Sequence, residues 1–104
     1  MSEPNLSLIE ELSGNDMEFR KKLIGIIKSE LPAEIAVYRD CVMSDHVQAA
    51  AIVHKLKHKI SILGMFDGYQ VAEDYEEELK EGRWEGHEKF NELLEKMSQF
   101  IIEL

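Results

Sequence analysis

Residues 53–64 read Val-His-Lys-Leu-Lys-His-Lys-Ile-Ser-Ile-Leu-Gly, and their apolar members continue a pattern that begins a few residues earlier. Successive apolar residues here are separated by steps of 3, 1, 3, 4 and 3, which place them in one stripe on one face of a helix. The stripe predicts a helix that starts at Ser44-Asp45, buries this face and ends near residue 63, with Gly64 as its C-cap. Its members are Ala49, Ile52, Val53, Leu56, Ile60 and Leu63.

His54 lies on the other side of the predicted helix. At helical spacing it points about 150° away from the centre of the apolar stripe, into solvent. Lys57 and His58 follow one turn later and flank it on either side. Ala50 and Ser61 are small residues on the same outward face, so a flat group could approach the imidazole closely.

The charge pattern sets this part of the chain apart. The whole chain of 104 residues has a net charge of −9, yet no acidic residue occurs between Asp45 and Asp67. Lys55, Lys57 and Lys59 all fall in that interval. A locally positive region around an exposed imidazole, on an otherwise acidic protein, indicates an anion bound at that imidazole.

Two helices are expected before this one. Residues 1–5 are expected to be a loose tail. Ser7 and Glu10 have the spacing of a capping box for a short helix, and Asp16 is suited to cap a second, longer helix. Apolar residues continue at helical spacing past Pro32, which is therefore expected to kink this second helix rather than to end it.

Two more helices are expected after the turn at residues 65–68. Gly82 breaks the first of them, and Trp84 opens the last helix, which presents an apolar face as far as Leu104. No segment alternates apolar and polar residues as a strand does. Four substantial helices joined by short breaks predict an all-α fold. We expect an antiparallel up-down four-helix bundle with a short extra N-terminal helix, forming one domain of residues 1–104.

Composition excludes several classes of protein. The chain is 44% hydrophobic and 32% charged, which is ordinary for a folded soluble domain. No apolar run is long enough to span a membrane, and we expect no signal peptide. Its single cysteine, Cys41, can form no internal disulfide and fits a reducing cytoplasm, where we expect it to pack in the interior rather than react. The acidic balance argues against nucleic acid as a partner.

The order of residues in the site helix resembles a known family. Residues 54–57, His-Lys-Leu-Lys, followed by the Leu-Gly pair at 63–64, are similar to the histidine-containing phosphotransfer (HPt) domain of two-component phosphorelays. The family pattern reads roughly Ala-His-x-Leu-Lys-Gly and then Leu-Gly. Val53 replaces the usual alanine, and His58 replaces a glycine that leaves room for the partner. The resemblance extends over about residues 8–104.

The resemblance implies a phosphorelay intermediate in two-component signal transduction. His54 would accept a phosphoryl group from the aspartate of one response-regulator receiver domain and pass it to another, and Lys57 would pair with the phosphate oxygens. Glu76, twenty-two residues after the histidine, matches a family position near the site and would orient the imidazole. A solvated helix face is the open alternative for Glu76.

The resemblance also implies how the reaction is divided between proteins. The chain would bind no cofactor, because Mg²⁺ belongs to the partner receiver domain. It has no Gly-rich nucleotide loop, so we expect a phosphohistidine carrier and not an ATP-dependent kinase. A hybrid histidine kinase is a further expected partner, and the chain is expected to be monomeric.

Partners are expected to dock on the face around His54, with Lys55 and Lys59 meeting an acidic partner surface. A patch of small and apolar residues around a polar site suits a transient interface. The residues expected on this docking face are Ala50, Ala51, Lys55, His58, Ser61 and Ile62.

Two other functions remain open from the sequence. Because His58 departs from the family pattern, the chain could be a helical adaptor that binds partners without carrying phosphate. His54 and His58 also have the i, i+4 spacing of a metal-binding pair. However, Lys-Leu-Lys lies between them, and three lysines disfavour a cation, so no metal site is predicted. His46 and His87 are expected to be surface residues without partners.

Overall fold

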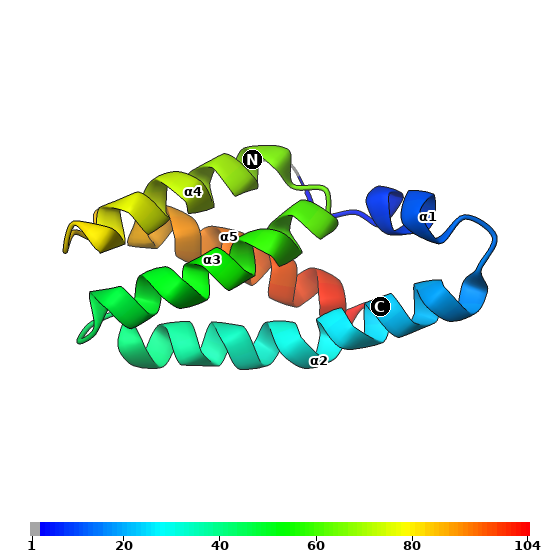
Figure 1. Cartoon of the computed structure of the whole chain (residues 1–104), viewed down its shortest axis with the longest axis horizontal. Helices are drawn as coiled ribbons and strands as arrows, with labels where there is room; N and C mark the ends of the chain where they lie inside the picture. The colour runs from blue at the N-terminus through cyan, green and yellow to red at the C-terminus, as the bar shows by residue number, and fades with distance from the viewer. Residues whose placement is uncertain (1–2) are drawn as a thin grey trace.

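The computed structural model describes residues 3–104, in which five helices and no strand occur. Helices α2 to α5 run alternately up and down, and the short α1 lies beside the N-terminal part of α2 (Figure 1). The predicted all-α bundle with a short extra N-terminal helix is therefore confirmed. The helices are α1 (Ser7–Ser13), α2 (Met17–Cys41), α3 (His46–Ile62), α4 (Phe66–Lys80) and α5 (His87–Ile102).

The two longest helices begin at aspartate caps. The side chain of Asp16 accepts a hydrogen bond from the backbone N–H of Phe19 at 3.0 Å, as predicted. Asp45 accepts one from the N–H of Gln48 at 3.0 Å and so starts α3. Each cap satisfies one of the backbone donors that a helix N-terminus leaves unpaired. The second helix runs without a break through Pro32, as predicted.

The start of α1 differs from the prediction. Leu6 is its N-cap and no side chain of the helix caps it, so the expected capping box at Ser7 does not form. Instead, the side-chain oxygen of Asn5 accepts a hydrogen bond from the N–H of Ser7 at 3.1 Å. The cap therefore comes from two residues earlier than the sequence pattern indicated.

Residues 3–5 are held against the bundle. Pro4 is buried, and the N–H of Asn5 donates to the carbonyl oxygen of Leu63 at 2.8 Å. Glu3 and Lys96 form an ion pair at 2.9 Å. The prediction of a loose tail is therefore wrong for residues 3–5, because these contacts tie the segment to the end of α3 and to α5. Residues 1 and 2 of that predicted tail lie outside the described part of the chain.

The last helix begins at His87 and not at Trp84. Gly82 adopts a φ of 77°, which turns the chain as the sequence indicated. Glu78 of α4 accepts a hydrogen bond from the N–H of Gly86 at 3.0 Å. Residues 83–86 therefore form a loop, and α5 begins only after them. Trp84 is consequently half-buried in the loop that precedes α5.

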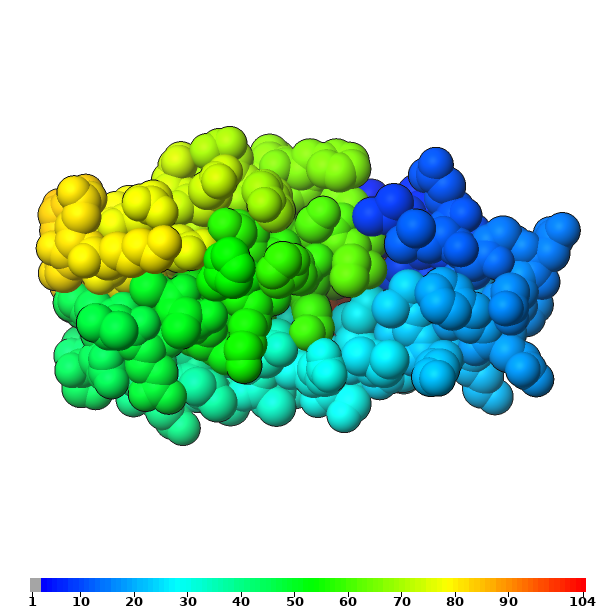
Figure 2. All heavy atoms as spheres, viewed as in Figure 1, coloured from blue at the N-terminus to red at the C-terminus, as the bar shows by residue number. Residues whose placement is uncertain are grey.

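The core lies between α2, α3, α4 and α5. All six residues of the predicted α3 stripe are buried, and Tyr38, Tyr75 and Phe90 meet edge-on or tilted in the interior. On the face drawn in Figure 2, α3 lies between α2 and α4. No helix among residues 3–104 has both the length and the apolar character needed to cross a membrane.

Candidate functional site

His54 projects from the middle of α3, on the side opposite the buried stripe. Its side chain is 55% exposed, whereas Val53 and Leu56, its neighbours on the core side, are fully buried. The helical phase therefore exposes the imidazole as predicted, and the structure in addition places it beside α4.

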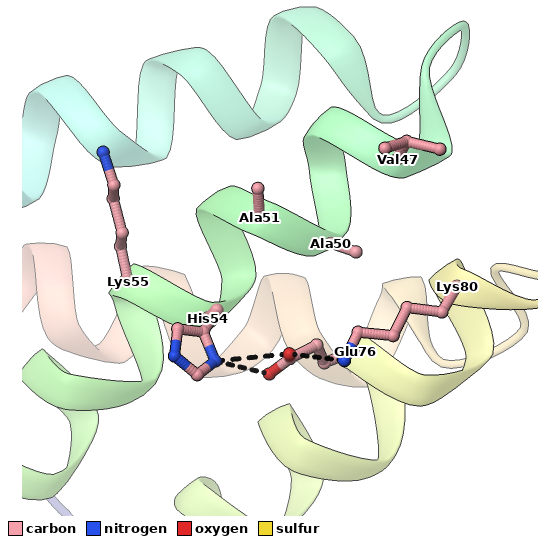
Figure 3. A pocket seen from close by; sticks show the side chains of 7 residues that line it. All are labelled: Val47, Ala50, Ala51, His54, Lys55, Glu76 and Lys80. Carbon is pink, nitrogen blue, oxygen red and sulfur yellow. Dashed lines mark hydrogen bonds and ion pairs between the residues drawn. The ribbon is translucent and has the colours of Figure 1, made fainter.

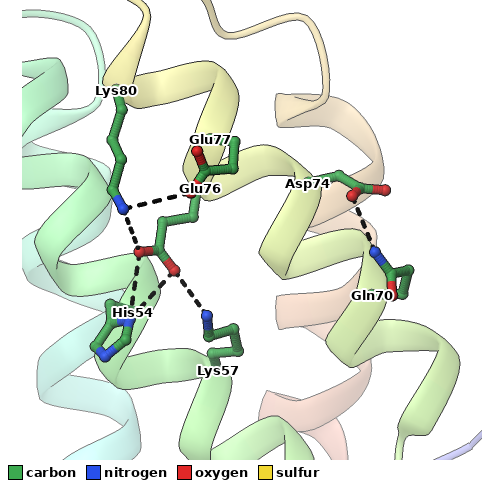
Figure 4. A network of polar contacts seen from close by, with 7 residues as sticks. All are labelled: His54, Lys57, Gln70, Asp74, Glu76, Glu77 and Lys80. Atoms are coloured by element: carbon green, nitrogen blue, oxygen red, sulfur yellow. Dashed lines mark hydrogen bonds and ion pairs between the residues drawn. The ribbon is translucent and has the colours of Figure 1, made fainter.

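Glu76 lies on α4 directly beside the imidazole. Its carboxylate oxygens are both 3.3 Å from Nδ1 of His54. Oε1 is 3.0 Å from Nζ of Lys57, and Oε2 is 3.2 Å from Nζ of Lys80 (Figure 4). Glu76 is only 5% exposed. The alternative of a solvated helix face is therefore wrong for this residue, and its side chain lies where an imidazole-orienting group is needed.

The surroundings of Glu76 keep its carboxyl group ionised. Burial by itself raises the pKa of Glu76, but hydrogen bonds from Lys57, Lys80 and His54 outweigh it, so the pKa lies below its usual range. An ionised carboxylate only accepts hydrogen bonds. Nδ1 of His54 is therefore the donor in this contact, and in the neutral form of the ring the lone pair is then on Nε2.

The second ring nitrogen of His54, Nε2, lies on the side of the ring away from Glu76. In Figure 3 the second ring nitrogen points away from both Glu76 and Lys80. The tautomer and the ring orientation are thus set together by one carboxylate. A neutral imidazole with an exposed Nε2 is a nucleophile near pH 7.

Lys57 occupies a different position from the one predicted. It is 8% exposed, and its Nζ lies beside Glu76 and 5.5 Å from the centre of the Tyr69 ring. Burial lowers the pKa of Lys57, but the hydrogen bond and charge of Glu76 outweigh it and raise the pKa. Lys57 is therefore charged, yet its ammonium group neutralises Glu76 beneath the imidazole instead of standing free on the outward face.

Lys80 is a residue of the candidate site that was not predicted from the sequence. It follows Glu76 by one turn of α4, its side chain is 54% exposed, and it also lies 3.4 Å from Glu77. The four-residue spacing from Glu76 is a signal of pairing within a helix. That spacing alone did not reveal which face of α4 meets His54.

A groove of about 410 Å³ opens beside the imidazole (Figure 3). Val47, Ala50 and Ala51 line it with apolar surface, and Val47 is 80% exposed. Ala50 is buried rather than outward-facing as predicted, because α4 lies close to this part of α3. The charged or polar residues that line the groove are His54, Lys55, Glu76 and Lys80.

The other predicted docking residues lie elsewhere. His58 is exposed, and its ring centre is 5.3 Å from that of His54, with the two rings nearly perpendicular at 88°. Ser61 and Ile62 are half-buried, and Ile62 packs against the core. The predicted docking face therefore has two parts. The groove lies N-terminal to His54 along α3, and His58 lies on the C-terminal side of His54.

Lys59 does not face a partner as predicted. Its Nζ lies 2.8 Å from Glu30 and 3.1 Å from Glu34, both on α2. Burial lowers the pKa of Lys59, but the hydrogen bonds to these carboxylates outweigh it and raise the pKa. The positive region read from the sequence is thus largely neutralised by acidic side chains of α2 and α4. Lys55 remains exposed beside the groove.

His46 and His87 have an aromatic neighbour, contrary to prediction. The ring of Trp84 stacks on His87 at 4.5 Å between ring centres and lies 6.4 Å from His46.

Cys41 is buried, as predicted. Its burial, and to a smaller extent the nearby charge of Asp45, raise the pKa of its thiol. Among residues 3–104, no three His, Cys, Asp or Glu side chains gather as a metal site would require.

Comparisons of the chain with protein families, with curated proteins and with solved structures give no match. The geometry around His54 therefore carries the functional argument.

Proposed function

We propose that the chain is a phosphohistidine carrier of the phosphorelay type, with His54 as the residue that is phosphorylated. The observation that carries this proposal is the buried, ionised Glu76 on Nδ1 of His54, which leaves Nε2 as an exposed nucleophile. A structural histidine on a helix surface has no need of a buried carboxylate held by two lysines.

The proposed step is a phosphoryl exchange between nitrogen and oxygen. The Nε2 lone pair attacks the phosphorus of an aspartyl phosphate, so an N–P bond forms while the P–O bond to the aspartyl carboxylate breaks. The ring keeps its Nδ1 proton and becomes cationic, and the charge of Glu76 stabilises that cation, as the carboxylate of a catalytic triad does. In the return step a second aspartate attacks phosphorus and the N–P bond breaks.

The lysines of the site would divide two tasks. Lys57 offsets the buried charge of Glu76, which would otherwise be costly. The side chain of Lys80 is 54% exposed and that of Lys57 only 10%, so of the two Lys80 is the lysine able to leave Glu76 and reach toward a phosphate oxygen. This assignment moves the phosphate-binding role expected of Lys57 largely to Lys80.

The groove beside His54 suits a protein partner. It offers apolar surface at Val47, Ala50 and Ala51 next to the nucleophile, with cations at its rim, as a transient interface with an acidic partner would require. We propose cytoplasmic response-regulator receiver domains as partners, and a hybrid histidine kinase as a source of phosphate. The receiver would supply Mg²⁺, and the carrier would act as a monomer without ATP.

Transfer from a panel of phosphorylated receiver domains tests the proposal. We expect label on the wild type that is lost in acid and stable in base, and no label on His54→Gln. His46→Gln, on the same helix, is the matched control and should be labelled like the wild type. Receivers that bind the chain without any transfer would contradict the carrier and support a helical adaptor.

A further inference from the structure

The ring of His58 lies close to that of His54 on the exposed part of α3. It follows His54 by one turn of α3, its ring centre lies 5.3 Å away, and the rings are nearly perpendicular. Both side chains are exposed, so a group attached to the Nε2 atom of His54 would share its surroundings with the second imidazole.

Three of the lysines near His54 are already paired with carboxylates of α2 or α4. Lys57 and Lys80 both pair with Glu76, on the α4 side, and Lys59 is held by Glu30 and Glu34 on α2. The free nitrogen of His54 points away from Glu76 and Lys80, in the direction in which α3 continues toward its C-terminus (Figure 3). His58 follows in the next turn of α3, with its ring centre 5.3 Å from that of His54.

We propose that His58 is a phosphoryl-binding residue, whose ring N–H donates a hydrogen bond to the phosphoryl group on His54 and prolongs its lifetime. This inference rests on the proposed function. An imidazole has at least one N–H donor in each of its tautomers, and hydrogen bonds to phosphate oxygens are among the stronger ones in proteins. No bond to phosphorus is made or broken by His58.

The direction of the effect follows from the chemistry of hydrolysis. Loss of a phosphoryl group to water passes through a loose transition state that resembles metaphosphate. A donor held against the phosphate oxygens favours the compact, fully charged phosphohistidine, and the second ring also screens one side of phosphorus from water. Removal of His58 should therefore shorten the lifetime of the phosphorylated chain.

Chemical phosphorylation tests this inference without any partner protein. The chain is treated with phosphoramidate, and the ³¹P resonance of phosphorylated His54 is identified by its absence in His54→Gln. We expect His58→Ala to shift this resonance and to shorten the half-life about five- to tenfold, as expected for the loss of one hydrogen bond of ordinary net strength. His58→Gln, which keeps an N–H donor, should recover most of the lifetime.

His46→Ala is the matched control, because it removes an imidazole from the same helix at a distance from the site. It should leave both the resonance and the half-life unchanged. A half-life and a ³¹P shift in His58→Ala equal to those of the wild type would overturn the inference. Failure of receivers to transfer phosphate, with His54 still labelled by phosphoramidate, would count against the proposed function alone. Failure of phosphoramidate to label His54 would overturn both.

Discussion

Glu76 is the residue on which the geometry of the site depends. Its carboxylate meets His54 from one side and the ammonium groups of Lys57 and Lys80 from two others. A buried charge is tolerated when it is paired and hydrogen-bonded, and removing one member of such a group leaves the others uncompensated. Glu76 therefore links the orientation of the imidazole to the stability of the bundle.

Glu76→Gln tests that link, because the amide keeps the shape and removes the charge. At pH 7 we expect it to lower the free energy of unfolding by about 2 to 4 kcal/mol, since the buried Lys57 loses its counter-charge. Urea unfolding measures the change. Glu77→Gln is the control: this exposed neighbour pairs with Lys80 at the surface, and its loss should change stability by no more than about 0.5 kcal/mol.

The difference between the wild type and Glu76→Gln should depend on pH. The pKa of Glu76 is lower in the folded chain than its usual value of 4.5, so the unfolded state binds more protons between the folded and unfolded values. The contribution of Glu76 is complete above the unfolded pKa and is lost as the pH falls through the folded pKa. Urea unfolding should therefore give a smaller difference at pH 3 than at pH 7. An equal difference at both would show that the charge is not responsible.

At the scale of single elements, α3 carries the candidate nucleophile and most of the residues that line the groove. Its first two turns supply Val47, Ala50 and Ala51 to the wall of the groove, and the helix begins at the side-chain cap of Asp45. The hydrogen bond of Asp45 at the start of α3 is therefore expected to keep the residues that line the groove in a helical conformation.

Asp45→Ala should lower the free energy of unfolding by about 1 kcal/mol through loss of this cap. It should also speed hydrogen exchange of the amides of the first turn of α3, beside the groove. Asp16→Ala removes the equivalent cap of α2 and serves as the matched control, with a similar loss of stability but faster exchange at the start of α2. If exchange in α3 rose equally in both variants, the cap of Asp45 would not be what orders the groove wall.

At the scale of the whole molecule, the N-terminal segment joins parts of the chain that are distant in sequence. Asn5 donates through its backbone N–H to Leu63 at the end of α3 and accepts through its side chain from Ser7. Gly64 adopts a φ of 75°, and a Cβ there would lie 2.6 Å from the Asn5 side-chain oxygen. The turn after the site helix and the cap of α1 are thus built against each other.

A comparison of Gly64→Ala with Gly82→Ala distinguishes the cost of displacing Asn5 from the cost of backbone strain. Both glycines have φ near 75°, but a Cβ at Gly82 would meet nothing within 4 Å. Alanine in the left-handed region should cost about 1 to 2 kcal/mol at each site. At Gly64 a further cost of about 1 to 3 kcal/mol is expected from displacing Asn5. Thermal unfolding of the two variants measures the difference, and equal melting temperatures would contradict the proposed packing of Asn5.

Much of the local structure could be predicted from the sequence. The apolar stripe of α3, the cap at Asp16, the turn at Gly82 and the outward position of His54 all depend on residues close together in the chain. Helical periodicity fixes which residues share a face, and cap and turn chemistry depend on single side chains and on φ. The boundary errors at Ser7 and Trp84 arose where Asn5 and Glu78 supplied hydrogen bonds that local patterns do not reveal.

The sequence by itself determined the helices of this protein and the exposure of its candidate nucleophile, since both follow from the spacing of apolar residues. Only the tertiary structure decided which charges meet. Lys57 turned inward to Glu76, Lys59 turned to α2, and Lys80 joined the site from α4. Those pairings depend on how each helix is rotated about its own axis against its neighbour. That rotation is set by packing of the whole core, and the periodicity of one helix does not contain it.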